Sequence, residues 1–208
     1  MRCREPYCRK TIGAWAADNN AKVIHISTDY VFDGTSETPL KETDTPDPIN
    51  VYGLTKLHGE QALQASGAAY VIIRTAWVYS VYGANFVKTM MRLMNEREEI
   101  GVVVDQIGTP TYARDLAQAI MDIISAPEFI QGVYHYSNEG KISWHQFVTA
   151  VKEIKGFSTT INAIGSEAFP TPAKRPNFSL LDKSKIKDVY KVSAPDWKTS
   201  LQEMLNKL

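Results

Sequence analysis

The sequence predicts an α/β protein built on a partly doubly wound parallel sheet, with a small C-terminal α+β lobe. Short β-branched apolar runs, such as residues 22–27 and 70–74, alternate with longer segments of helical periodicity. This alternation is typical of βαβ units, in which helices connect parallel strands. After about residue 140 the order of the elements changes, which indicates an appended lobe rather than more sheet.

The first half of the chain contains two predicted helix–strand pairs. The i, i+3, i+4 spacing of Ile12, Trp15 and Ala16 predicts an amphipathic helix within residues 11–19. The apolar run 22–27 predicts a strand buried on both faces. A loop rich in Gly and Pro follows, and then we expect a helix over residues 50–66 that Gly67 ends, and a strand over 70–74.

The second half continues the alternation and then departs from it. We expect helices over residues 86–97 and 113–124 and strands over 101–104 and 132–136. In the lobe we expect a helix from Ser143, a strand near Thr160, a Pro-rich loop at 170–176 and a helix from about Asp196. We assign residues 1–84 and 100–125 to a dinucleotide-binding part. Residues 85–99 and 126–208 are assigned to a substrate-binding lobe.

Composition excludes several classes of protein. Lys plus Arg and Asp plus Glu both total 23, so the chain has no net positive charge. This argues against a nucleic-acid-binding protein, which needs a broad positively charged surface. No apolar run approaches the roughly 20 residues that span a bilayer, and the basic opening is not followed by a signal-peptide core. Cys3 and Cys8 have no partner ligands, so we expect no metal site and a cytoplasmic protein.

In doubly wound folds that bind dinucleotides, a glycine-rich turn that binds the phosphates usually follows the first strand. None of the 12 glycines falls in G-x-G-x-x-G or G-x-x-G-x-x-G spacing. Either the protein binds no dinucleotide, or the first βαβ portion is missing from this chain. The residues described next favour the second interpretation.

Tyr52 and Lys56 lie four residues apart and therefore on one face of the predicted helix. A nearby cation stabilises a phenolate and moves the pKa of a phenol toward the working range of a proton donor. With ten tyrosines in the chain the pair alone is weak evidence. The residues that follow the strand 22–27 strengthen the interpretation of this pair as catalytic. Thr28 would lie at the carboxyl end of the sheet, where such folds bind ligands.

Several segments in a fixed order resemble one enzyme family. HISTDYVFDG, KETDTPDPINVYGLTKLHGE, RTAWVY and DQIGTPTYARDLA, with the tail segment Phe169–Pro176, are similar to the dTDP-4-dehydrorhamnose reductases, which are extended short-chain dehydrogenase/reductases. The resemblance runs from about Ile12 to the C-terminus. It implies a truncated Rossmann-like sheet and reduction of the 4-keto group of dTDP-4-dehydro-6-deoxy-L-mannose to dTDP-L-rhamnose by NADPH or NADH.

The resemblance also implies residue roles. Tyr52 matches the proton donor, Lys56 its helper at the nicotinamide ribose, and Thr28 the hydroxyl residue of the catalytic triad. The expected cofactor contacts are Ile26, Tyr52 and Lys56, and the expected substrate contacts are Thr28, Asp29, Tyr30, Trp77 and Arg175. The guanidinium of Arg175 would suit a diphosphate.

The start of the chain departs from the family pattern, since no strand and glycine-rich turn precede the segment around Thr28. We therefore expect an N-terminally truncated form that binds the nicotinamide cofactor weakly on its own. A gene fragment, a misassigned start codon and a frameshift are equally compatible with this opening. The preference for NADPH or NADH, a dependence on Mg²⁺ and the assembly into a homodimer stay open.

Two other functions compete with the reductase. One is a non-catalytic binding role like that of the regulatory β subunit of methionine adenosyltransferase, which belongs to the same family. Another is a different nucleotide-sugar reductase, dehydratase or epimerase. A dehydratase needs further acid–base residues beside Thr28, and Asp29 is the only carboxylate there.

Overall fold

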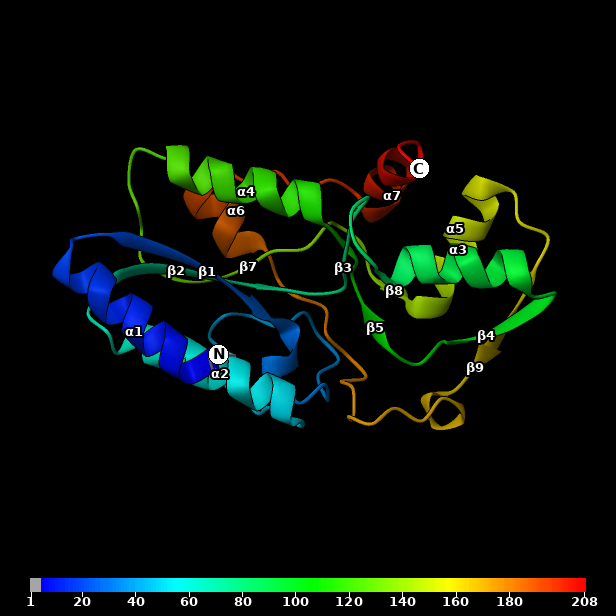
Figure 1. Cartoon of the computed structure of the whole chain (residues 1–208), viewed down its shortest axis with the longest axis horizontal. Coiled ribbons are helices and arrows are strands. Elements are labelled where there is room, and N and C mark those ends of the chain that lie inside the picture. Colours follow the sequence, from blue (N-terminus) through cyan, green and yellow to red (C-terminus); the bar gives the residue numbers. More distant parts are fainter. Residues whose placement is uncertain (1–4) are drawn as a thin grey trace.

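The computed structural model describes residues 5–208, so Cys3 lies outside the described part. The main sheet has the order β1-β2-β7, formed by β1 (Lys22–Thr28), β2 (Ala69–Thr75) and β7 (Gly132–His135), all parallel. Helices α1 (Glu5–Asp18) and α2 (Val51–Gln64) cover one face. Helices α4 (Ala113–Ser125) and α6 (Ser184–Tyr190) cover the other (Figure 1). The predicted α/β architecture is confirmed.

The centre of this sheet is its best buried part. Val71, Ile72 and Ile73 of β2 are fully buried, because strands lie on both sides and helices on both faces. On the α4 side, Val71 and Ile73 pack with Ile123 and Ile186 in one apolar cluster. Burial of such side chains supplies most of the stabilisation of a fold of this kind.

The edge of the sheet differs from expectation. Residues 23–26 of β1 are only half-buried, because among the described residues β1 pairs with β2 alone. The expected burial of this strand on both faces is therefore wrong. On α1, Ala16 is buried, but the side chains of Ile12 and Trp15 are more than half exposed, so the predicted apolar stripe does not face the core.

The second part of the molecule is a lobe with its own core. It contains α3 (Phe86–Glu96), β4 (Glu99–Val103), α5 (Trp144–Lys155), β9 (Thr160–Ile164) and α7 (Trp197–Leu205). Its apolar cluster includes Val87, Phe147, Val148, Leu201 and Met204. Figure 1 shows this lobe beside the main sheet.

The expected division of the chain needs two corrections. The expected boundary at residue 100 places all of β4 except Glu99 in the dinucleotide-binding part, yet β4 pairs in parallel with β9 of the lobe. Conversely, β7 was assigned to the lobe within residues 126–208, yet it pairs with β2 in the main sheet, and α6 packs beside it. Strand pairing joins segments far apart in sequence, which periodicity along the chain does not report.

Short elements connect the two parts. The 3-10 turn η1 (Asp29–Val31) follows β1, and η2 (Ser166–Ala168) follows β9. Two-residue strands pair as β3 (Val78–Tyr79) with β6 (Thr111–Tyr112) and β5 (Ile107–Gly108) with β8 (Ile142–Ser143). None of the helices in the described part is both long and apolar enough to cross a membrane.

Candidate active site

A cavity of about 520 Å³ opens where the carboxyl ends of β1 and β2 meet the lobe. Its lining includes all eight residues that the sequence singled out: Ile26, Thr28, Asp29, Tyr30, Tyr52, Lys56, Trp77 and Arg175. The rest of its wall includes Thr75, Phe86 and Trp144. The carboxyl end of a parallel sheet is the usual ligand site of such folds, so the position agrees with the chemistry of the residues.

Thr28 ends β1 and begins the η1 turn. Its Oγ1 accepts a hydrogen bond from the backbone N–H of Tyr30 at 3.2 Å, which caps the turn. The same hydroxyl donates to Oδ1 of Asp29 at 3.0 Å. The Thr28 hydroxyl is therefore oriented at the floor of the cavity by two neighbours before any ligand binds.

The N-terminal turn of α2 lies directly against η1. Asn50 caps the helix by accepting the Gly53 N–H at 2.8 Å. A Cβ at position 53 would stand 2.0 Å from the carbonyl oxygen of Tyr30, so only glycine permits this approach. The close contact brings Tyr52, one residue earlier, beside the strand end that carries Thr28.

Tyr52 and Lys56 project from this helix into the cavity. The rings of Tyr52 and Tyr30 meet edge to face, with centroids 5.6 Å apart. The Lys56 ammonium donates to the carbonyl oxygen of Ile26 at 3.0 Å, which holds the charge near the carboxyl end of β1. Tyr52, Lys56 and Thr28 thus line the same cavity.

Asp29 and Tyr30 lie in a poorly hydrated part of the site. Burial raises the pKa of Asp29 to about 6, while hydrogen bonds from Ser179 and Thr28 oppose the shift. Burial also raises the pKa of the Tyr30 phenol, and the negative charge of Asp29 adds to this, whereas Arg175 lowers it. A carboxyl that titrates near neutrality, beside the hydroxyl of Thr28, is typical of a functional site.

Trp77 occupies a strained backbone conformation. Its φ of 49° lies in the left-handed region, which a bulky residue rarely adopts. Its indole stacks on that of Trp144, with centroids 3.6 Å apart and planes within 13°. A Cβ on Gly108 would stand 3.0 Å from the same indole, so Gly108 on one side and Trp144 on the other hold Trp77 in place.

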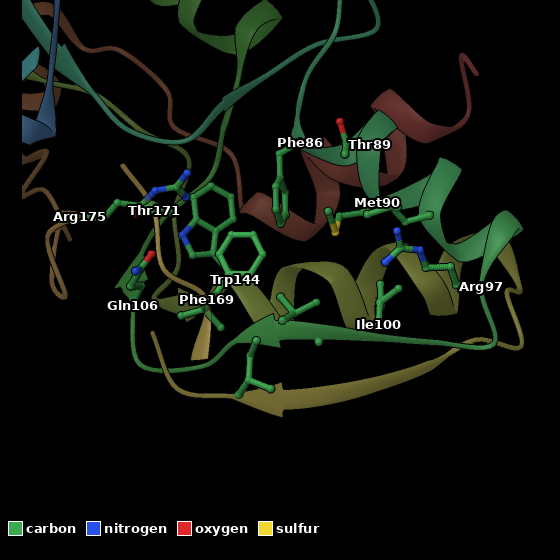
Figure 2. Close-up of a pocket in the computed structure, with 15 residues that line it drawn as sticks. Phe86, Thr89, Met90, Arg97, Ile100, Gln106, Trp144, Phe169, Thr171 and Arg175 are labelled. Carbon is green, nitrogen blue, oxygen red and sulfur yellow. The ribbon is translucent and has the colours of Figure 1, made fainter. Parts of the chain in front are cut away.

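A second cavity of about 440 Å³ adjoins the first within the lobe. Phe86, Trp144 and Arg175 line both cavities, so a long ligand could occupy the two together. The walls of the second are mainly apolar, with Met90 and Ile100 among them (Figure 2). Such a lining suits a flat ring more than a sugar.

Arg175 belongs to the Pro-rich loop that crosses between the two parts. Its neighbour Lys174 accepts, through its carbonyl oxygen, a hydrogen bond from the Asn50 side chain at 2.9 Å. Pro176 packs closely against Gly34, whose φ is 80°, and Phe178 N–H donates to the Gly34 carbonyl oxygen. These contacts hold the backbone of the loop, and Arg175 lines both cavities. Figure 2 shows its side chain at the second cavity.

A nicotinamide cofactor fits this chain in part. Ile26, Tyr52 and Lys56 line one cavity and suit the nicotinamide ribose, which a hydroxyl and an ammonium can hydrogen-bond. Within residues 5–208 no glycine-rich turn joins a strand to a helix N-terminus, so the described part offers no cradle for the cofactor diphosphate. No group of three metal-ligating side chains occurs among the described residues either.

Comparison with known proteins shows the family of this chain. The family model described as RmlD substrate binding domain matches residues 7–208. The chain is 44% identical to the dTDP-4-dehydrorhamnose reductase of Shigella flexneri, covering 97% of this chain and 70% of that protein. The chain belongs to this family. The enzyme of the same name from Escherichia coli K12 is 42% identical, over 95% of this chain and 67% of that protein.

Solved structures of family members share the fold. A dTDP-4-dehydrorhamnose reductase from Clostridium acetobutylicum superposes with a TM-score of 0.92 and 38% identity, over 96% of this chain and 70% of that one. The Bacillus anthracis enzyme, in complex with NADP, gives a TM-score of 0.91 at 36% identity, with the same coverage. The chain thus spans about 70% of the length of these family members.

Sequence reasoning missed part of the site. Trp144, Thr75 and Gly108 line or shape the main cavity, but each lies within an ordinary local pattern. Trp144 is the first residue of α5, after the capping box of Ser143 and Gln146, and nothing near it indicates a stack with Trp77. Gln106 lines the second cavity, and its neighbour Asp105 accepts hydrogen bonds from Ser166 at the start of η2.

Proposed function

We propose that this chain reduces the 4-keto group of dTDP-4-dehydro-6-deoxy-L-mannose to give dTDP-L-rhamnose, with NADPH or NADH as the reductant. The observation that carries the proposal is the convergence of Thr28, Tyr52 and Lys56 on one cavity at the carboxyl end of the sheet. Membership of the dTDP-4-dehydrorhamnose reductase family supports it. The expected cytoplasmic location and homodimer stay predictions.

Each of the three residues has a distinct task at the ketone. The Tyr52 phenol gives its proton to the ketone oxygen, and the Lys56 ammonium stabilises the phenolate that remains. In the structure the Thr28 hydroxyl donates a hydrogen bond to Asp29. With substrate bound, the hydroxyl rotates and donates to the same ketone oxygen instead. Reduced nicotinamide, when bound, supplies the hydride that the ketone carbon accepts.

The second cavity is the proposed binding site for the nucleotide end of the substrate. The dTDP-sugar has a thymine ring at one end and the reacting sugar at the other, joined by a diphosphate. The mainly apolar cavity of about 440 Å³ suits the thymine, and Arg175 at the junction suits the diphosphate. Asp29, Tyr30 and Trp77 are then left to contact the sugar.

The experiment is a reaction of the ketosugar with NADPH, followed by chromatography of the nucleotide sugars. NADPH is supplied at millimolar concentration, because the described residues offer no diphosphate cradle. The proposal predicts that wild-type protein forms dTDP-L-rhamnose and that Tyr52→Phe forms it at least about a hundredfold more slowly. Binding of the dTDP-sugar without any turnover would instead indicate a regulatory binding role.

A further inference from the structure

The face of α2 that carries Tyr52 and Lys56 continues to Glu60, four residues further on. Residues at i, i+4 and i+8 form one stripe along a helix. Glu60 is fully buried on this stripe, although a carboxylate is rarely taken so far from water without a partner. Partners for its charge must therefore lie nearby.

Both partners of Glu60 lie on the main sheet. Its carboxylate accepts a short hydrogen bond from the Ser27 hydroxyl. It also accepts from Arg74 Nε, 3.2 Å from each carboxylate oxygen, and from Arg74 Nη2 at 2.8 Å. Side chains of the ion pair are at most 5% exposed. This two-oxygen geometry restricts rotation as well as distance.

The two partners precede the catalytic end of the sheet by one residue. Ser27 and Arg74 face each other in the parallel register of β1 and β2, and Thr28 and Thr75 are the next pair. Lys56 is bound to the carbonyl oxygen of Ile26, immediately before Ser27. The stripe of α2 therefore contacts consecutive residues of β1.

We propose that Glu60 is a positioning residue: through Ser27 and Arg74 it fixes the rotation of α2, and so holds Lys56 and Tyr52 in place relative to Thr28. Buried ion pairs of this kind contribute little net stability compared with apolar residues, but they restrict geometry. The inference rests on the proposed roles of Tyr52 and Lys56. Its test does not need turnover.

The surroundings of Arg74 determine the choice of variant. Its guanidinium lies 5.1 Å from the centre of the Phe32 ring and faces His135, its register partner on β7. Removing Glu60 alone would leave a buried cation without its counter-charge and could unfold the chain. The double variant Glu60→Leu/Arg74→Met removes both charges together, so the local net charge is unchanged, no buried charge is left unpaired, and the contacts of Glu60 with the sheet are lost.

The readout is the pKa of Tyr52 in protein labelled with ¹³C at the ring carbon that bears the hydroxyl. A Tyr52→Phe spectrum assigns the resonance. In the wild type the nearby ammonium is expected to lower this pKa, and in the folded double variant we expect it to rise by about one unit. Ser27→Ala, which leaves the ion pair intact, is expected to raise it by a smaller amount. Should the double variant fail to fold, Ser27→Ala decides the test.

A control variant separates positioning from general loosening of the helix. Leu63→Ala removes a buried side chain from the last turn of α2 and is expected to lower the melting temperature without moving the Tyr52 pKa. A lowered wild-type pKa that stays the same in the folded variants, or that Leu63→Ala raises equally, would overturn this inference alone. A wild-type Tyr52 that titrates at its ordinary value of about 10 would overturn the proposed function as well.

Discussion

Gly53 of α2 lies against the carbonyl oxygen of Tyr30 so closely that a Cβ at position 53 would stand 2.0 Å from it. This contact sets how near the helix carrying Tyr52 comes to the strand end carrying Thr28. The neighbouring Pro48 side chain, 3.0 Å from the same Cβ position, leaves no room on the other side. The backbone on both sides of the contact would have to shift to accept any side chain.

The first prediction follows from that contact. Gly53→Ala should lower kcat for ketosugar reduction by about tenfold or more, because about 1 Å of displacement can cost a hundredfold in rate. The KM for the dTDP-sugar should change less than kcat, because neither Gly53 nor Tyr30 lines the second cavity, which is proposed to hold the thymine. Leu54→Ala, at an exposed position of the same helix, is the matched control and should retain the wild-type rate. Equal rates for Gly53→Ala and the control would disprove the role of this contact.

The second prediction concerns Trp144. Trp144→Ala should weaken binding of dTDP-L-rhamnose about tenfold, since the indole lines both cavities and supports Trp77 by stacking. Isothermal titration calorimetry measures the change. Trp15→Ala, on the exposed side of α1, is the control and should bind as the wild type does. Unaltered affinity in Trp144→Ala would mean that the nucleotide sugar does not occupy the joined cavities.

The third prediction concerns Asp29 and stability. Its pKa is about 6 in the folded chain against an ordinary value of 3.8, so the folded state keeps a proton that the unfolded state releases. The contribution to stability is therefore present below pH 4 and falls by about 3 kcal/mol as the pH rises to 6. Asp29→Asn should gain stability relative to the wild type over that interval. Urea unfolding at several pH values tests this, and parallel curves would refute it.

The fourth prediction has the opposite sign. Burial, and next the charge of Arg74, lowers the pKa of His135 to about 3 from an ordinary 6.5. The folded state binds fewer protons than the unfolded state, so this contribution is complete above pH 6.5 and is lost as the pH falls. Between pH 7 and pH 5 the loss is about 2 kcal/mol. In the same urea experiment, the free energy of unfolding of His135→Gln should fall less than that of the wild type between pH 7 and pH 5. An equal fall in the two proteins would contradict this prediction.

Local signals in the sequence predicted much of this structure. The helix of Tyr52, the buried strand β2 and the helix after Ser143 follow from the periodicity of apolar residues along the chain. The candidate site could be assembled because its residues lie at the ends of such elements. The i, i+4 spacing of Tyr52 and Lys56 needs no knowledge of distant residues.

Features that depend on distant partners could not be predicted. β4 has the composition of any short strand, and only its pairing with β9 places it in the lobe. Glu60 and Arg74 are 14 residues apart, and neither shows from its neighbours that it is buried. The stack of Trp77 on Trp144 joins a strained loop to the start of a helix in the other part of the molecule.

Transfer of deuterium to C4 of the dTDP-sugar from NADPH that carries deuterium at both C4 positions, followed by mass spectrometry, tests the central claim most directly. The account predicts dTDP-L-rhamnose that carries one deuterium, formed at least about a hundredfold more slowly by Tyr52→Phe. Labelled product formed equally fast by Tyr52→Phe, or none from a wild-type chain that binds both ligands, would contradict it.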